Sequence, residues 1–174
     1  MKYKKIVTIA IVACVLCIGI YYIVYSATVI SIDQEKLYQI VYVVDGDTFN
    51  VKIGSHEIRV RMLGIDTPET VDPRKPAQCY GNEASDQTKE LLSGRQVRLK
   101  LNPNREEKDK YGRYLAYVYR DDNLFVNEFL LENGFAREYT YGKSYMLQKE
   151  FREIENKAKT ENIGLWSTCA QVIK

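Results

Sequence analysis

Residues 58 to 70 read I-R-V-R-M-L-G-I-D-T-P-E-T, and the rest of the chain is organised around this stretch. Apolar side chains alternate with arginines in its first half, which is the period-two pattern of a β-strand with unlike faces. Pro68 ends the pattern, because proline has no N–H for a sheet ladder and restricts the residue before it to extended backbone. The stretch therefore predicts a strand that delivers Arg61, Asp66 and Glu69 to a stiff end.

Composition sets the size and charge of the protein. The chain has 174 residues, which is enough for one domain with a moderate core. It carries 25 Lys and Arg against 23 Asp and Glu, and three of the lysines precede an apolar N-terminal run. The charges beyond that run are therefore nearly balanced, so a bound polyanion would have to be held by a local cluster of basic residues.

The N-terminal run extends from Ile6 to Ile32 without a charged residue. At about 1.5 Å per residue, a helix of this length can cross a bilayer. Because lysines precede the run, we expect the N-terminus to stay in the cytoplasm and the remainder to be exported. Residues 1–32 are thus predicted to be a membrane anchor, followed by a polar linker over residues 33–36 and a domain over residues 37–174.

Two alternatives to an uncleaved anchor remain open. Val24 and Ser26 could serve as the small residues of a signal-peptide cleavage site, which would release a secreted protein. The sequence Ile11-Val12-Ala13-Cys14 also resembles a lipoprotein cleavage box, although the apolar run continues beyond Cys14. In all three cases the domain is extracytoplasmic.

Export changes the interpretation of the four cysteines. Cys14 and Cys17 lie in the apolar run and are read as small hydrophobic residues. An oxidising compartment favours a disulfide between Cys79 and Cys169, and two free thiols are the alternative. Neither cysteine has a CxxC or histidine partner, which disfavours zinc.

The domain reads as an α+β fold made mainly of a barrel. Its five expected strands cover residues 37–44, 49–53, 58–65, 95–101 and 113–120, and its three expected helices cover residues 82–92, 124–132 and 145–160. Asn82 is expected to cap the first helix, and Met146 is expected on the buried face of the third. One helix after the third strand and two after the fifth favour a small five-stranded Greek-key barrel of the OB type.

Five polar residues occur at the predicted strand ends and turns. Asp47 begins one strand and Asp66 ends another in the same meander, so their carboxylates can converge on a hard cation such as calcium. Arg61 and Arg113 have planar guanidinium groups that match phosphate oxygens. Glu69 can reach a water without serving as a metal ligand. The group predicts phosphoryl transfer, and the alternative is that the arginines form ordinary surface ion pairs.

Six segments of the sequence resemble one known family, in order and in spacing. They are V-D-G-D-T (44–48), R-M-L-G-I-D-T-P-E-T (61–70), Y-G-N-E-A (80–84), D-K-Y-G-R-Y-L-A-Y-V-Y (109–119), N-E-F-L-L-E-N-G-F-A (127–136) and G-L-W-S (164–167). Together they resemble the staphylococcal nuclease (thermonuclease) family. The resemblance implies an OB-fold barrel with three helices and a calcium-dependent endonuclease. Such an enzyme cleaves DNA and RNA on the 5′-oxygen side of the phosphodiester and leaves 3′-phosphates.

The resemblance also implies a role for each matching residue. Asp47 and Asp66 resemble the carboxylate ligands of one Ca²⁺ ion, and Thr67 the ligand that offers its backbone carbonyl. Glu69 is similar to the residue usually assigned as general base. Arg61 and Arg113 resemble the pair that binds the phosphate and stabilises the transition state.

Four further positions resemble substrate contacts of the family, namely Lys110, Tyr111, Tyr139 and Tyr141. The segment between Arg137 and the last two tyrosines is one residue shorter than the family pattern, so packing beneath the third helix is an alternative role for them. Aromatic and basic residues together suit single-stranded DNA or RNA, whose bases stack on aromatic rings. We expect a monomer without an obligate protein partner.

Two non-enzymatic functions compete with the nuclease. The chain could be a membrane-tethered nucleic-acid-binding OB module that has lost catalysis, or a structural extracellular domain that binds another protein. Neither function requires Arg61, Glu69 and Arg113 to occur together, and all three are present.

Overall fold

The computed structural model describes residues 3, 11–22, 30–70 and 76–170. The chain divides into two units, Met1–Ile32 and Asp33–Lys174. Residues 11–22 of the first unit are helical. Among the residues that the structure describes, no helix has the length and apolar character that a bilayer span requires. Much of the run predicted to be an anchor, residues 6–10 and 23–29, lies outside the described residues.

The second unit is built on a closed five-stranded barrel in the order β1-β2-β3-β6-β5. Its strands are β1 (Tyr38–Val43), β2 (Thr48–Ile53), β3 (His56–Met62), β5 (Gln96–Leu101) and β6 (Tyr114–Arg120). Neighbouring strands are antiparallel except β3 and β6, which are parallel and place Arg61 opposite Leu115. The predicted five-stranded barrel is confirmed.

Side-chain alternation explains why these segments form the barrel. In β3, Ile58, Val60 and Met62 are buried, while Arg59 between them is exposed. Burial of the interior side chains removes apolar surface from water, at about 25 cal/mol per Å². The interior is filled by fully buried residues from all parts of the barrel, among them Phe49, Val51, Val60, Leu99 and Val118.

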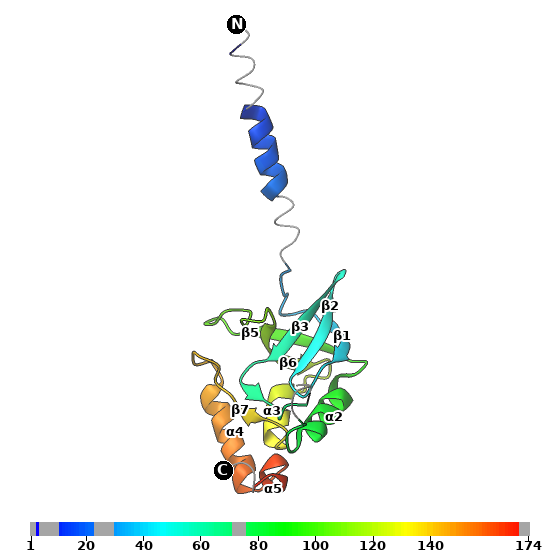
Figure 1. Ribbon diagram of the computed structural model, residues 1–174, viewed down its shortest axis with the longest axis vertical. Coiled ribbons are helices and arrows are strands. Elements are labelled where there is room, and N and C mark those ends of the chain that lie inside the picture. The colour runs from blue at the N-terminus through cyan, green and yellow to red at the C-terminus, as the bar shows by residue number, and fades with distance from the viewer. Residues whose placement is uncertain (1–2, 4–10, 23–29, 71–75, 171–174) are drawn as a thin grey trace. The chain divides into compact units, whose positions relative to one another are not determined.

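The helices of the unit are α2 (Gly81–Leu92), α3 (Val126–Glu132), α4 (Gln148–Thr160) and α5 (Leu165–Thr168). They gather at one end of the barrel (Figure 1). All three predicted helices are present, and within the described residues the four-residue α5 is an additional helix that is too short to show a periodic pattern. A two-stranded sheet of β4 (Ile65–Asp66) and β7 (Arg137–Glu138) was also not predicted, since strands of two residues carry no alternation.

Two local predictions about the helices are wrong. Asn82 does not cap α2, because the helix begins at Gly81 and its N-cap is Tyr80, which makes no side-chain cap hydrogen bond. Met146 is 63% exposed, and it precedes α4, which begins at Gln148. Tyr145 takes the buried position instead and donates its hydroxyl to the carbonyl of Gly64 at 3.1 Å.

A buried asparagine joins α3 to the barrel beside the end of β3. The backbone N–H of Val118 donates to Oδ1 of Asn127 at 2.9 Å, and Nδ2 of Asn127 donates to the carbonyl of Leu63 at 2.8 Å. Asn127 is fully buried, so these bonds are made without competition from water. They fix the chain where it leaves β3 and approaches Asp66.

Candidate active site

Arg61, one residue before the end of β3, connects two carboxylates. Its Nε lies 2.9 Å from Oδ1 of Asp47, and its Nη2 lies 2.9 Å from Oδ1 of Asp66. Nη1 donates to the backbone carbonyls of Met62 at 2.8 Å and Ile65 at 2.7 Å. An arginine has five N–H donors, so one Nη2 hydrogen has no partner in the described part of the chain. The side chain is only 12% exposed, which excludes the interpretation of a surface ion pair.

Asp47 is held from several sides at the start of β2. Its Oδ2 accepts hydrogen bonds from the backbone N–H of Thr67 at 2.9 Å and from the Thr67 hydroxyl at 3.1 Å. Its Oδ1 accepts from the Thr48 hydroxyl at 3.0 Å. Gly46 permits this approach, since a Cβ there would lie 2.5 Å from Oγ1 of Thr67. The turn before β2 and the end of β4 are thereby locked together.

The carboxylates in this region perturb one another. Burial, and then the charge of Asp47, raise the pKa of Asp45 to about 6. Burial also raises the pKa of Asp66, against the attraction of Arg61 and with a further contribution from Asp47. Both shifts show that negative charge is crowded and poorly solvated here. A bound cation would relieve this crowding, which is a property expected of a metal site.

The donor set fits a hard divalent cation with oxygen ligands. Asp47 comes from the turn before β2 and Asp66 from the end of β4, and Arg61 joins them. Neither histidine nor cysteine lies among these side chains. In the described residues, no three His, Cys, Asp or Glu side chains are arranged to hold a metal. The two carboxylates would thus need a backbone carbonyl, such as that of Thr67, and water to complete the six to eight oxygens that Ca²⁺ takes.

Arg113 directly precedes β6, which runs parallel to β3, and it lines the same pocket as Arg61. Its Nε bonds Oδ2 of Asp109 at 2.7 Å, and its backbone N–H donates to Oδ1 of Asp109 at 3.0 Å. Its Cζ lies 5.4 Å from the ring centre of Tyr111. Neither Nη group has a hydrogen-bond partner in the described residues, so both can donate to a ligand. Arg113 is therefore held in position through its Nε, and its Nη groups can bind a ligand.

Both arginines line one pocket of about 230 Å³, together with Asp66. Three tyrosines, Tyr111, Tyr139 and Tyr141, line the same pocket and are 71%, 45% and 45% exposed. The rings of Tyr139 and Tyr141 are 6.2 Å apart, so they form one aromatic wall. This exposure argues against simple packing beneath α4 as their role.

Lys110 lies close to two of these tyrosines. Its Nζ is 4.9 Å from the ring centre of Tyr111 and 6.0 Å from that of Tyr141. Side-chain hydrogen bonds to the two tyrosines raise the pKa of the lysine. Arg105 donates to the carbonyls of Tyr141 and Lys143 and so holds this segment in place. The structure thus brings all four predicted substrate contacts together.

Glu69 is exposed and does not line the pocket, but its charge contributes to the raised pKa of Asp66. Its Oε1 accepts a hydrogen bond from the N–H of Thr70 at 2.9 Å. Gln78 holds the Glu69 backbone on both sides: Oε1 of Gln78 accepts from the Glu69 N–H at 3.1 Å, and the Gln78 N–H donates to the Glu69 carbonyl at 2.9 Å. The position of Glu69 is thus fixed through its peptide groups.

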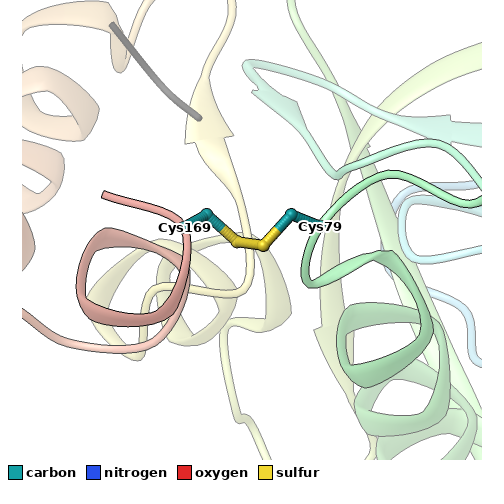
Figure 2. The surroundings of a disulfide bond; sticks show 2 residues. All are labelled: Cys79 and Cys169. Atoms are coloured by element: carbon teal, nitrogen blue, oxygen red, sulfur yellow. A yellow bond between two sulfur atoms is a disulfide. The ribbon is translucent and has the colours of Figure 1, made fainter. Parts of the chain in front are cut away.

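Cys79, next to Gln78, forms the predicted disulfide with Cys169 (Figure 2). The two Cα atoms are 6.0 Å apart, and the bond joins the segment before α2 to the residue that follows α5. Cys169 is buried, and α5 is tied to the rest of the unit by a hydrogen bond from the Leu165 N–H to the Gly134 carbonyl at 2.9 Å. The backbone contacts of Glu69 are therefore anchored to the C-terminal helix.

Comparison with known proteins agrees with this geometry. Residues 59–168 match the family model described as "Staphylococcal nuclease homologue". The chain belongs to the staphylococcal nuclease family. The resemblance of its six sequence segments to that family is confirmed.

Relatives within the staphylococcal nuclease family cover most of the chain. A thermonuclease of Staphylococcus hyicus is 38% identical over 170 residues, which are 94% of this chain and 99% of that protein. A thermonuclease of Staphylococcus intermedius is 38% identical over 76% of this chain and 77% of its own length. Endonuclease YncB of Bacillus subtilis is 38% identical over 82% of this chain and 68% of its own length.

Three residues of the nuclease-family site were not predicted as functional. Asp45 accepts from the N–H groups of Asp47 and Thr48, Asp109 orients Arg113, and Arg137 lies 3.7 Å from Oδ2 of Asp66. The D-G-D sequence could have indicated a role for Asp45, and the spacing of four residues between Asp109 and Arg113 could have indicated their pairing. Arg137 has no sequence signal, because only the pairing of β4 with β7 brings it to Asp66.

Proposed function

We propose that the protein is a calcium-dependent extracytoplasmic endonuclease. It would hydrolyse the phosphodiester bonds of DNA and RNA on the 5′-oxygen side and leave 3′-phosphates. The observation that carries this proposal is that Arg61, joined to both Asp47 and Asp66, lines one pocket with Arg113. The relatives named thermonuclease and endonuclease support the same reaction class.

The two arginines act on the charge of the phosphoryl group. Arg113 offers both Nη groups, and Arg61 offers its remaining Nη2 hydrogen, so oxygens of one phosphate can receive hydrogen bonds from both residues. Fixed donors stabilise charge that develops in the transition state without the cost of reorganising solvent. Asp109, Asp47 and Asp66 keep the guanidinium groups in position.

Glu69 is the carboxylate that orients or deprotonates the attacking water. It belongs to the chain segment that carries Asp66 and Thr67, and Gln78 fixes its backbone. A Ca²⁺ ion held by Asp47, Asp66 and the carbonyl of Thr67 would supply Lewis-acid polarisation of a phosphoryl oxygen. The Glu69 carboxylate then needs only to reach a water at the rim of the pocket.

The pocket favours a nucleotide from a single strand. Its volume of about 230 Å³ and its tyrosine wall suit one unpaired base, which is inaccessible while stacked within a duplex. Lys110, beside Tyr111 and Tyr141, can bind a further phosphate. Export is supported by the charge-free run of residues 6–32 behind three lysines, with membrane attachment through that run or secretion after its cleavage.

Digestion of single-stranded DNA by the purified full chain tests the proposal. With Ca²⁺, we expect fragments that end in 3′-phosphates, and EGTA should abolish cleavage while the circular dichroism spectrum stays unchanged. Glu69→Gln should lower kcat by at least a hundredfold with KM within a few-fold, because Glu69 acts mainly in the transition state. Glu83→Gln, in the first turn of α2, is the matched control. Binding without cleavage in wild type would instead establish the non-catalytic module.

A further inference from the structure

A second concave surface adjoins the active-site pocket. It is a groove of about 490 Å³ that is lined by Asn50, Glu57, Arg59, Tyr111, Gly112 and Arg113. Tyr111 and Arg113 line both the groove and the pocket, so the two hollows adjoin at this pair. A chain whose phosphate is bound at Arg113 can therefore extend into both hollows.

Strand geometry explains how the groove extends from the catalytic centre. Arg59 precedes Arg61 by two residues on β3, and alternate residues of a strand point to the same face. Across the sheet, Arg59 is paired with Asn50 and Arg61 with Thr48 on β2. Arg59 in the groove and Arg61 in the pocket are thus successive residues on the outer face of β3.

The arginine of the groove is held in place by a polar network. Its Nε donates to Oδ1 of Asn50 at 3.1 Å, and its Nη2 donates to the hydroxyl of Tyr42 at 3.2 Å. Asn50 is only 6% exposed, and its Nδ2 donates to the Tyr42 hydroxyl at 3.0 Å and to Oε1 of Glu57 at 2.5 Å. Arg59 is exposed, and its Nη1 has no partner in the described residues. The guanidinium is therefore oriented but still able to bind a ligand.

The charges of the groove favour a phosphodiester. Arg59 and Arg113 are positive and Glu57 is negative, so the lining carries a net charge of +1. Arg59 lacks a carboxylate partner within salt-bridge distance in the described part of the chain, whereas Arg61 and Arg113 have such partners. The charge of Arg59 is therefore not neutralised by an ion pair, and the guanidinium can bind an external anion. The exposed ring of Tyr111 provides a stacking face beside it.

We propose that this groove is a binding subsite for the polynucleotide on the far side of the scissile phosphate from the tyrosine-lined pocket. Arg59 binds the next backbone phosphate, and Tyr111 contacts the intervening nucleoside. The inference rests on the proposed nuclease function and adds a substrate subsite to it. It requires that the enzyme act within a chain, because a substrate with one nucleotide cannot reach Arg59.

Two substrates separate the subsite from the catalytic centre. One is a single-stranded octanucleotide, and the other is a nitrophenyl ester of a nucleoside 5′-phosphate, which has no second nucleotide. Both are assayed with the full chain and Ca²⁺, using wild type, Arg59→Ala, Arg59→Lys and Glu57→Gln. Arg98→Ala is the matched control, because Arg98 also lies in a strand and bonds an asparagine side chain, that of Asn123, but lines neither hollow.

Arg59→Ala should raise KM for the octanucleotide about five- to tenfold, with kcat within twofold, and should leave the ester unaffected. The slope of log affinity against log salt for the octanucleotide should fall by about 0.7, as expected for one lost phosphate contact on a single strand. Arg59→Lys should recover part of the affinity. Glu57→Gln should lower KM for the octanucleotide at low salt, because it removes the opposing charge.

The subsite is refuted if Arg59→Ala behaves like Arg98→Ala on the octanucleotide, or if the ester loses as much as the octanucleotide. An equal loss on both substrates would mean that Arg59 only supports the fold around the active site. If wild type cleaves neither substrate, the proposed nuclease function fails. If wild type cleaves both and Arg59→Ala is unchanged, the nuclease stands and the subsite does not.

Discussion

Replacement of Cys79 and Cys169 by alanine should destabilise the protein strongly. The disulfide joins residues separated by 90 positions, so it closes most of the 33–174 unit into a loop. The loop-closure relation for a ring of this length gives about 4–5 kcal/mol of stabilisation, through the entropy that the unfolded chain loses. Domains typically unfold at a cost of about 5–15 kcal/mol, so the loss is a large part of the total.

The loss can be measured by chemical denaturation and by heating. The double variant should unfold at lower urea concentration, and its Tm should fall by roughly 8–20 °C, since about 1 kcal/mol corresponds to 2–4 °C for a unit of this size. Dithiothreitol should reproduce the shift in wild type and add nothing in the double variant. Cys14→Ala with Cys17→Ala is the matched control, because these two cysteines form no disulfide.

A second readout concerns the active site. Because Gln78 holds both sides of the Glu69 peptide and adjoins Cys79, loss of the disulfide should lower kcat well below the melting temperature, while KM for substrate changes little. The entropy argument fails if the double variant loses less than about 1 kcal/mol of unfolding free energy, or if the Cys14 and Cys17 control shifts equally. The positioning argument fails if kcat at 20 °C is unchanged.

Three further perturbations probe the arrangement of the site. Gly46→Ala should reduce stability by about 1–3 kcal/mol and impair cleavage, because its Cβ would meet the Thr67 side chain. Gly19→Ala is the steric control in thermal melts, because a Cβ there meets no atom within 4 Å and the residue has no positive φ. Equal stability and equal cleavage of the two variants would contradict the clash. Asn127→Ala should lower the free energy of unfolding in urea by about 2–4 kcal/mol, because it leaves two buried backbone groups without a hydrogen-bond partner. Asn133→Ala is the control, because it removes one partly buried hydrogen bond. Similar losses in the two variants would show that the hydrogen bonds of Asn127 are unimportant for stability. Arg113→Ala should reduce kcat by about 10²–10³-fold, and Arg113→Lys should restore little of this activity because an ammonium group lacks the planar fork of a guanidinium. Near wild-type kcat in Arg113→Lys would show that Arg113 does not bind the phosphate through two parallel hydrogen bonds.

The regular strands and the positions of Asp47 and Asp66 could be predicted because their signals are local. The alternation in residues 58–62 identifies a strand face, and Pro68 marks its end, so the placement of Asp66 beyond a barrel strand follows from neighbouring residues. Asp47 follows in the same way from the turn that precedes β2. Each of these inferences uses fewer than about ten residues of sequence.

The support of the site could not be predicted because it depends on contacts between distant segments. Asn127 reaches Leu63 across 64 positions, and Arg137 reaches Asp66 only because two-residue strands pair. Met146 illustrates the opposite error, since an apolar residue near a helix was assigned to its buried face although the helix begins two residues later. Tyr145 was available one position away, and only the three-dimensional packing selects it.

The parallel pairing of β3 with β6 has a consequence for how the protein gains activity. Residues 54 positions apart, Arg61 and Leu115, become neighbours only when the barrel closes, and the two arginines of the pocket are separated until then. A nascent chain that ends before Tyr114 would contain both aspartates and both arginines, but it would lack the strand that pairs with β3. Under the proposed nuclease function, cleavage would therefore require that β6 has paired with β3.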